Sequence, residues 1–204
     1  MRDVAIFLFN EIEVLDFAGP FEVFGVAGLR SGGEPPFNVF TVAEKSPVIA
    51  RNGLTITPTY GLDEHPQPDI LLIPGGGGYH ANGTPFGSRR EMHNPVVLDW
   101  IRRYADPAEL ILSVCTGSLI LARTGLLDKL AATTHFMAMD ALREASPTTS
   151  VRPDDRYVDN GKVITSAGVS AGIDMSLYVV SRLLGPDAAD ETAWYMQYDY
   201  WRRS

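Results

Sequence analysis

The chain contains five short apolar runs, each of strand length and most followed by glycine or a turn. Their hydrophobicity is nearly continuous rather than alternating, which is typical of strands covered on both faces, as in a parallel sheet. This pattern constrains the fold more than any other feature of the sequence. The predicted strands are Val4–Phe9, Phe37–Val42, Ile70–Ile73, Leu110–Val114 and Lys162–Thr165.

Stretches with helical periodicity lie between and after these runs, and Pro20, Pro95 and Pro186 stand where a first-turn proline belongs. Strands that alternate with helices predict an α/β fold with a doubly wound, mostly parallel sheet and helices on both faces. No repeat, linker or domain boundary is evident, so residues 1–204 are predicted to form a single domain. The predicted helices are Pro20–Leu29, Pro95–Tyr104, Gly117–Thr124, Ala138–Glu144, Ala171–Leu184 and Asp187–Tyr198.

The charge and the cysteine count limit the partners and the compartment. The formal net charge is −8 and the sequence pI about 4.9, which argues against a nucleic-acid partner. Paired arginines such as Arg89 and Arg90 are scattered, and we expect them to be solvated surface pairs. No apolar run approaches the roughly 20 residues that span a bilayer, and no signal-like segment precedes Val4. One cysteine excludes an intrachain disulfide, so we expect a soluble cytoplasmic protein that binds neither nucleic acid nor membranes.

Cys115 is the strongest candidate for chemistry. It stands where a buried strand ends and an apolar helix begins, and the small residues Gly117 and Ser118 follow it, as a sharp nucleophile turn requires. A thiol at a helix N-terminus is expected to have a lowered pKa, and free N–H groups of the first turn stabilise developing negative charge. Free cysteines are usually buried and inert, but this position favours a nucleophile.

Two further segments are expected near Cys115. The glycine-rich run Gly75–Gly78 follows a predicted strand; it lacks the spacing of a phosphate loop, so we expect its N–H groups to approach a ligand beside the cysteine. Asp16 lies between the first predicted strand and helix, where it either caps the helix or reaches the sulfur. A carboxyl beside the sulfur would transfer protons, and the two groups would share one proton.

The four histidines give a weaker signal. His135 follows a short predicted strand and serves either as a structural residue or as a catalytic base. No group of Cys, His or carboxylate residues has the spacing of metal ligands, so we predict no metal.

Taken together, these segments resemble the ThiJ/PfpI superfamily of class I glutamine-amidotransferase-like domains, and the similarity extends over nearly the whole chain. The resemblance implies a flavodoxin-like, class I glutamine-amidotransferase-like fold. The motifs that carry it are Val14–Pro20, Ile73–Gly76, Ser113–Ser118, Gly125–Asp128, Ala132–His135, and Thr165–Gly168 leading to Ala171–Asp174.

Two branches of the superfamily share this pattern: isonitrile hydratases and the sensor domains of AraC-type transcription regulators. The hydratase resemblance implies a homodimer that acts on a small molecule without a cofactor, with Cys115 as nucleophile, Asp16 as its carboxyl partner and Thr116 near the substrate. Amides of Thr116, Gly75 and Gly76 would bind developing charge. The product would be an N-substituted formamide.

The alternatives are a sensor that binds ligand without catalysis and a redox or stress-protective protein in which Cys115 is oxidised. The chain stops at Ser204 with no helix-turn-helix segment, so we expect an enzyme rather than a regulator. The peptidase branch has histidine after the nucleophile and glutamate near the first helix, and Thr116 and Asp16 depart from both features.

Overall fold

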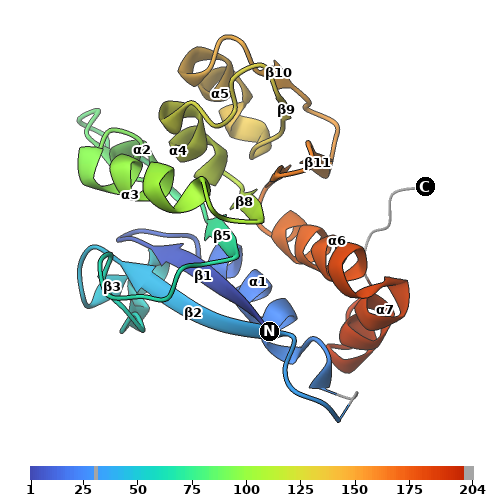
Figure 1. Ribbon diagram of the computed structural model, residues 1–204. Coiled ribbons are helices and arrows are strands. Elements are labelled where there is room, and N and C mark those ends of the chain that lie inside the picture. Colours follow the sequence, from blue (N-terminus) through green and yellow to red (C-terminus); the bar gives the residue numbers. More distant parts are fainter. Residues whose placement is uncertain (30–31, 200–204) are drawn as a thin grey trace.

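The computed structural model describes residues 1–29 and 32–199, which fold around a six-stranded sheet with the order β11-β12-β8-β5-β1-β2 (Figure 1). Neighbouring strands are parallel except β11, which pairs antiparallel with β12 at the edge. The predicted doubly wound, mostly parallel sheet is confirmed. The strands are β1 (Arg2–Leu8), β2 (Phe37–Ala43), β5 (Ile70–Ile73), β8 (Leu110–Val114), β11 (Tyr157–Asp159) and β12 (Val163–Ser166).

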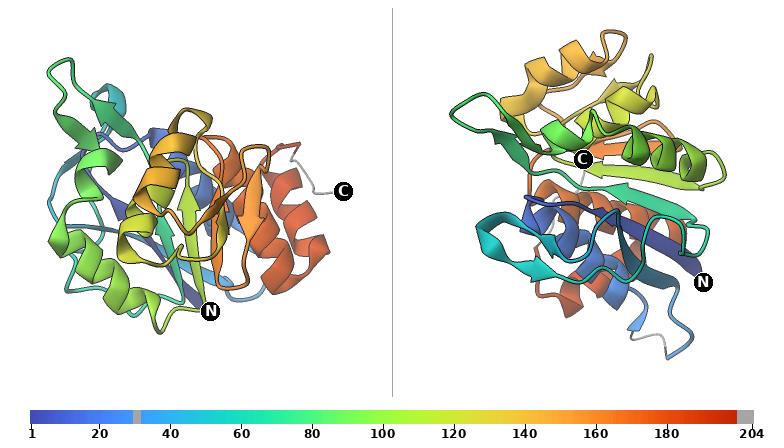
Figure 2. Two further views of the ribbon diagram at one scale, coloured as in Figure 1. Left: turned by 90° about the horizontal axis from the view of Figure 1, so that it is seen from above. Right: turned by 90° about the vertical axis from the view of Figure 1, so that its left-hand side faces the viewer.

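Helices cover both faces of this sheet (Figures 1 and 2). On one face α1 contacts α6, which contacts α7; on the other face α4 contacts α2, α3 and α5. Among the described residues, no helix combines the length and apolar character needed to cross a bilayer. The helices are α1 (Val14–Val26), α2 (Ser88–Glu91), α3 (Pro95–Ala105), α4 (Gly117–Thr124), α5 (Met139–Ala145), α6 (Ala171–Leu184) and α7 (Pro186–Tyr195), with single 3₁₀ turns at η2 (Arg51–Gly53) and η3 (Phe136–Ala138).

Short two-stranded sheets lie in the connections between these elements. One of them is a hairpin that pairs residues 77–79 with residues 85–87. The hairpin leads directly into α2. The pairs are β3 (Val48–Ile49) with β4 (Thr55–Ile56), β6 (Gly77–Tyr79) with β7 (Pro85–Gly87), and β9 (Ala131–Ala132) with β10 (Ser150–Val151).

The core follows the hydrophobic pattern closely. β5 and β8 are buried along their whole length, and β1 is buried from Val4 onward. Helices on both sides leave neither face of these strands in water, so both faces must be apolar. The predicted bounds Ile70–Ile73 and Leu110–Val114 match the observed strands residue for residue.

The start of α1 differs from the prediction. Pro20 was expected in the first turn, but α1 begins at Val14 and continues through Pro20. A proline has no N–H, so inside a helix it leaves the carbonyl four residues earlier without its usual partner. For Pro20 this is the carbonyl of Asp16. The correction matters because it moves Asp16 from a connecting loop into the first turn of a helix.

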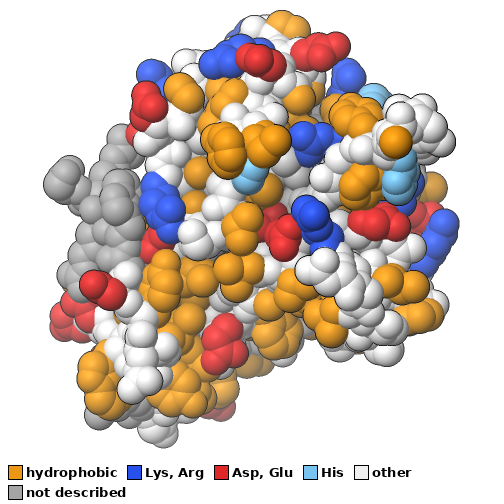
Figure 3. All heavy atoms as spheres, turned by 180° about the vertical axis from the view of Figure 1, so that it is seen from behind, with side chains coloured by type: hydrophobic (Ala, Val, Ile, Leu, Met, Phe, Trp, Pro, Cys, Tyr) orange, Lys and Arg blue, Asp and Glu red, His pale blue; other side chains and the backbone are white. Residues whose placement is uncertain are grey.

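The strand order determines which loops meet at the site. The end of β5 lies between the ends of β1 and β8. The chain leaves β1 for β2 on one side and returns to β5 on the other, and ligands bind at the carboxyl ends of strands beside such a switch point. In the left view of Figure 2 the parallel strands run away from the N-terminus, toward the face shown in Figure 3.

Candidate active site

Cys115 stands on the sharp turn that the sequence predicted, between β8 and α4. Its φ is +56°, a strained conformation for a residue with a side chain. Hydrogen bonds hold the turn: the Cys115 carbonyl accepts from Thr134 Oγ1 at 2.9 Å and from Ser118 Oγ at 3.1 Å. Its N–H points to the carbonyls of Ser166 and Ala167 at 3.2 and 3.1 Å. The surroundings therefore fix the backbone before any ligand binds.

The glycines around this turn permit a very close approach of backbone segments. A Cβ at Gly117 would collide with the carbonyl of Ile73. A Cβ at Gly75 would collide with the backbone nitrogen of Thr116. The end of β5 therefore lies directly against the start of α4, and this contact brings the glycine-rich segment to the cysteine.

Asp16 projects into the same place from the first turn of α1. Its side chain is fully buried, and Oδ2 accepts a hydrogen bond from the Gly75 N–H at 3.0 Å. Oδ1 is buried and has no hydrogen-bond partner among the described residues. Burial raises the pKa of Asp16 to about 7, although the Gly75 N–H and the Cys115 side chain act in the opposite direction. The carboxyl is thus poised to gain or lose a proton near neutral pH.

The pKa of Cys115 was expected to be lowered by the helix N-terminus, and this expectation is wrong. Burial, followed by the charge of Asp16, raises the pKa of the thiol to about 12, against the hydrogen bonds of the Thr116 and Val169 amides. The side chain is only 5% exposed, so loss of water outweighs the helix dipole. At neutral pH the pair titrates as a unit: the sulfur keeps its proton, and Asp16 is the group that ionises.

Two of the amides expected to bind developing charge are already engaged. The Gly75 N–H donates to Asp16, and the Gly76 N–H donates to Thr116 Oγ1 at 3.0 Å. Ser88 Oγ, at 2.8 Å from Thr116 Oγ1, donates to the Gly76 carbonyl at 2.7 Å. In this structure Gly75 and Gly76 position Asp16 and Thr116, and the amides that face the sulfur are those of Thr116 and Val169.

His135 lies at the edge of the site. Its Nδ1 accepts the Met137 N–H at 3.3 Å and so caps the 3₁₀ turn η3, while its ring packs against Gly168. Burial lowers the pKa of His135, and the charge of Arg89 lowers it further. The ring is therefore neutral, with a structural role at Nδ1.

Arg89 is a site residue that the sequence interpretation missed. It was expected to be a solvated surface residue, but it is half-buried, and burial lowers its pKa against the opposing influence of Tyr79 and Cys115. Nη1 donates to Ser88 Oγ at 3.3 Å, and Nε is buried without a partner among the described residues. The adjacent Arg90 instead forms an ion pair with the buried Glu91. The signal available in the sequence was an arginine shortly after a glycine-rich segment at the carboxyl edge of the sheet.

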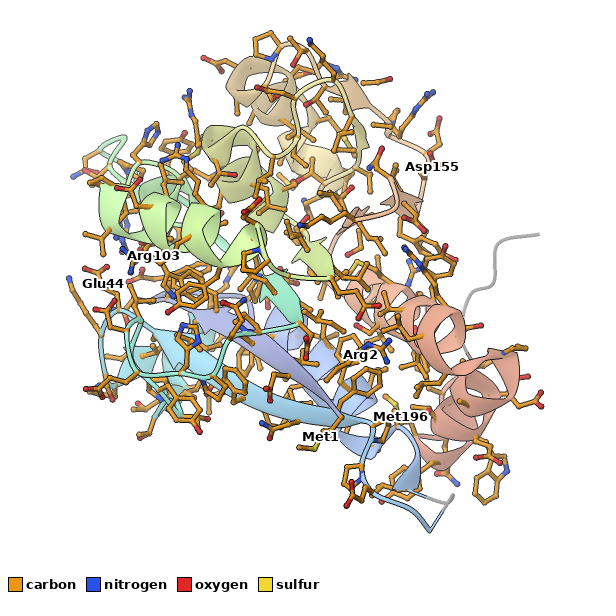
Figure 4. The ribbon with its side chains drawn as sticks, in the orientation of Figure 1. Met1, Arg2, Glu44, Arg103, Asp155 and Met196 are labelled. Atoms are coloured by element: carbon orange, nitrogen blue, oxygen red, sulfur yellow. The ribbon has the colours of Figure 1, made fainter. Side chains whose placement is uncertain are left out.

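A cavity of about 250 Å³ lies where β1 and β2 end, and its lining does not include Cys115 or Asp16. Within this lining Asn94 donates to both Glu44 and Glu91. Glu44, labelled in Figure 4, belongs to this lining. Within residues 1–29 and 32–199, no group of three or more His, Cys, Asp or Glu residues is arranged to hold a metal ion.

The model of the DJ-1/PfpI family matches residues 2–182. The chain belongs to the DJ-1/PfpI family. This DJ-1/PfpI protein is 34% identical over 197 residues to an isonitrile hydratase from Pseudomonas putida, covering 96% of the chain and 78% of the relative. It is 30% identical over 188 residues to the HTH-type transcriptional regulator CdhR from Pseudomonas aeruginosa, covering 92% of the chain but only 52% of the regulator.

Solved structures agree with this assignment. A ThiJ/PfpI family protein from Pseudomonas syringae superposes with a TM-score of 0.83 at 29% identity, covering 100% of this chain and 77% of that one. An AraC family transcriptional regulator from Pseudomonas putida superposes with a TM-score of 0.77, covering 96% of this chain and 100% of that one. Its identity of 19% supports the fold alone. The family thus contains both enzymes and regulators.

Proposed function

We propose that this DJ-1/PfpI protein is a cysteine-dependent hydratase that converts isonitriles to N-substituted formamides. The observation that carries the proposal is the fully buried Asp16, whose Oδ1 has no hydrogen-bond partner among the described residues and whose carboxyl interacts with the strained Cys115. A buried carboxyl that is not fully hydrogen-bonded costs stability, and a role in proton transfer accounts for its presence. The 34% identity to an isonitrile hydratase supports the choice of reaction.

In the first step the ionised Asp16 accepts the thiol proton while the sulfur adds to the terminal isonitrile carbon. The proton then passes to that carbon, which gives a thioimidate, R–N=CH–S, on Cys115. A base whose pKa is raised to about 7 suits this transfer, because about half of it is ionised at neutral pH and it still binds a proton well. The Thr116 and Val169 amides stabilise negative charge on the sulfur as it forms.

In the second step Asp16 takes a proton from water, whose oxygen attacks the thioimidate carbon. The nitrogen is protonated, the carbon–sulfur bond breaks, and the thiol regains its proton. The sum is R–NC + H₂O → R–NH–CHO, with the enzyme unchanged. Covalent catalysis divides one difficult hydration into two smaller steps.

The high thiol pKa also bears on the alternatives. Oxidation to sulfenic and sulfinic acid proceeds from the thiolate, so a buried thiol with a raised pKa disfavours the redox role. Ligand sensing without catalysis is the second candidate, because regulators match more than nine-tenths of the chain. A sensor needs a binding site but no proton acceptor, and therefore gives no reason for the unpartnered Asp16 oxygen.

Turnover of an aryl isonitrile, followed by the appearance of the formamide, tests the proposal. We expect the wild-type protein to produce formamide and Cys115→Ala to produce none above the uncatalysed rate. Cys115→Ser is the matched variant, because it keeps the shape and hydrogen bonding but is a much weaker nucleophile. Full activity in Cys115→Ala would remove the nucleophile, and saturable isonitrile binding without turnover by the wild-type protein would favour the sensor.

We also propose that the enzyme acts as a homodimer and, given its free cysteine, in the reducing cytoplasm. Size-exclusion chromatography with light scattering measures the mass directly. A monomer at micromolar concentration would overturn the dimer.

A further inference from the structure

Arg89 is a half-buried cation without a counter-ion. None of the ion pairs among the described residues includes it, whereas the acidic Glu13, whose charge also acts at the site, pairs with Arg51. Its one hydrogen bond to another described residue uses Nη1, although a guanidinium has five N–H donors. A buried donor without an acceptor costs free energy, so an acceptor supplied by a ligand would stabilise the site.

The position of Arg89 connects it to the reacting groups. Its partner Ser88 contacts the hydroxyl of Thr116, the residue that follows Cys115. The charges of Arg89 and Cys115 interact, and the charge of Arg89 lowers the pKa of His135, so the guanidinium lies within electrostatic range of both side chains. His135 is neutral and offers no competing positive charge. An anionic group of a ligand attached to Cys115 would therefore come within electrostatic range of Arg89.

We propose that Arg89 binds a carboxylate group of the ligand and thereby selects anionic substrates for Cys115. This inference rests on the proposed function, since it names the substrate class of the same site: isonitriles that carry a carboxylate. Guanidinium and carboxylate match in charge and planar geometry, and their hydrogen bonds are among the strongest that side chains make. The other use of a cation here is to stabilise the thiolate, which would assist neutral and anionic ligands equally.

Alkylation of the single cysteine separates these roles without requiring turnover. Iodoacetate and iodoacetamide attach to sulfur by the same displacement of iodide but differ in charge. We expect the ratio of their rates on the wild-type protein to exceed the ratio on free cysteine by about tenfold, as one charge-assisted contact predicts. Arg89→Gln should return the ratio to that of free cysteine. Mass spectrometry measures both rates.

Two variants serve as controls. Arg89→Lys keeps the charge without the planar fork and should retain part of the preference. Arg103→Gln removes an exposed arginine on α3 that pairs with Asp63 and is labelled in Figure 4, and it should leave the ratio unchanged. Equal slowing of both reagents in Arg89→Gln would assign the charge to the thiol and overturn the proposal. A wild-type ratio equal to that of free cysteine, or no alkylation by either reagent, would also overturn it.

A matched pair of isonitriles then separates this inference from the proposed function. Isocyanoacetate and its methyl ester differ only in charge, and we expect Arg89→Gln to lower the ratio of their kcat/KM values about tenfold. Hydration of both without an Arg89-dependent preference would overturn the inference and keep the hydratase. Hydration of neither, together with an Arg89-dependent alkylation ratio, would overturn the hydratase and keep the anion site.

Discussion

Asp16 and Asp174 occupy similar places in the fold but have different partners. Each lies in the first turn of a helix, α1 or α6, and they are 0% and 1% exposed. Asp174 forms an ion pair with Arg156 and accepts a hydrogen bond from Tyr198 Oη at 3.3 Å. None of the ion pairs among the described residues includes Asp16, which receives one backbone N–H from Gly75. Its carboxyl interacts with the thiol of Cys115.

The difference shows how to distinguish a structural carboxyl from a reactive one. Burial destabilises a charged group, and attraction to a neighbouring cation offsets this cost and keeps the carboxylate ionised, as for Asp174. Without a cation, as for Asp16, the same burial leaves the proton equilibrium near neutral pH. Perturbed carboxyls of this second kind are concentrated in active sites. The predictions below test whether this distinction separates activity from stability.

The largest expected effect is on turnover. Asp16→Asn keeps the shape of the side chain and the acceptor for the Gly75 N–H but removes the proton acceptor. Loss of a general base lowers rates by about 10² to 10⁴-fold, so we expect kcat for isonitrile hydration to fall within that range. The wild-type kcat/KM should fall with pH below about 7 as Asp16 is protonated, and the variant should lack this dependence. An unchanged rate would show that Asp16 takes no part in proton transfer.

The second effect concerns stability as a function of pH. The pKa of Asp16 is raised from 3.8 to about 7, so between these values the folded state binds a proton that the unfolded chain has released. The free energy of unfolding therefore decreases as pH rises from about 4 to 7 and then stays level. A shift of this size corresponds to roughly 4 kcal/mol. Urea unfolding of the wild type should show a lower free energy of unfolding at pH 8 than at pH 4 by this amount. In Asp16→Asn this contribution should be absent.

Much of this site could be predicted from the sequence, because local patterns were sufficient. The apolar run Leu110–Val114, the small residues Gly117 and Ser118, and the apolar helix specify a turn that any neighbouring context would preserve. The position of Cys115 between β8 and α4 could therefore be predicted. Its protonation state could not be predicted in this way, because it depends on how much water the rest of the fold excludes.

Arg89 and the setting of Asp16 could not be obtained locally either. Arg89 and Arg90 are identical neighbours in the sequence, and only the hairpin β6–β7 and helix α2 turn one toward Ser88 and the other toward Glu91. For Asp16, Pro20 suggested a helix start, but packing of α1 against α6 carries the helix through the proline. Tertiary contacts therefore override the local signal at both places.

The third prediction concerns Asp174, for which we expect a loss of stability rather than of turnover. Asp174→Asn removes the partner of Arg156, whose side chain is 30% exposed and therefore partly screened by water. We expect the free energy of unfolding to fall by about 2 kcal/mol, since loss of one member of a buried pair leaves the other uncompensated. The kcat for hydration should stay within about twofold, because Asp174 lies outside the proton-transfer pair. A large loss of kcat at unchanged stability would erase the distinction between the two aspartates.

The smallest effect tests whether an unpartnered polar atom is by itself a sign of function. Ser113 Oγ is fully buried in β8, two residues before Cys115, and has no hydrogen-bond partner among the described residues. Unlike Asp16, it carries no charge and does not face the reacting sulfur through any described interaction. Removal of an unpaired buried hydroxyl should cost nothing, so Ser113→Ala should raise the free energy of unfolding by about 0.5–1 kcal/mol.

The kcat of Ser113→Ala should equal that of the wild type, measured beside the unfolding curve. A loss of activity in Ser113→Ala would mean that turnover depends on buried polar atoms in general. The lack of a paired cation would then not identify Asp16 as the catalytic carboxyl. Unchanged activity in Ser113→Ala together with a large loss in Asp16→Asn would assign the chemistry to the unpaired carboxyl. The contrast is informative because both residues are fully buried and unpartnered at one oxygen, and only the ionisable group differs.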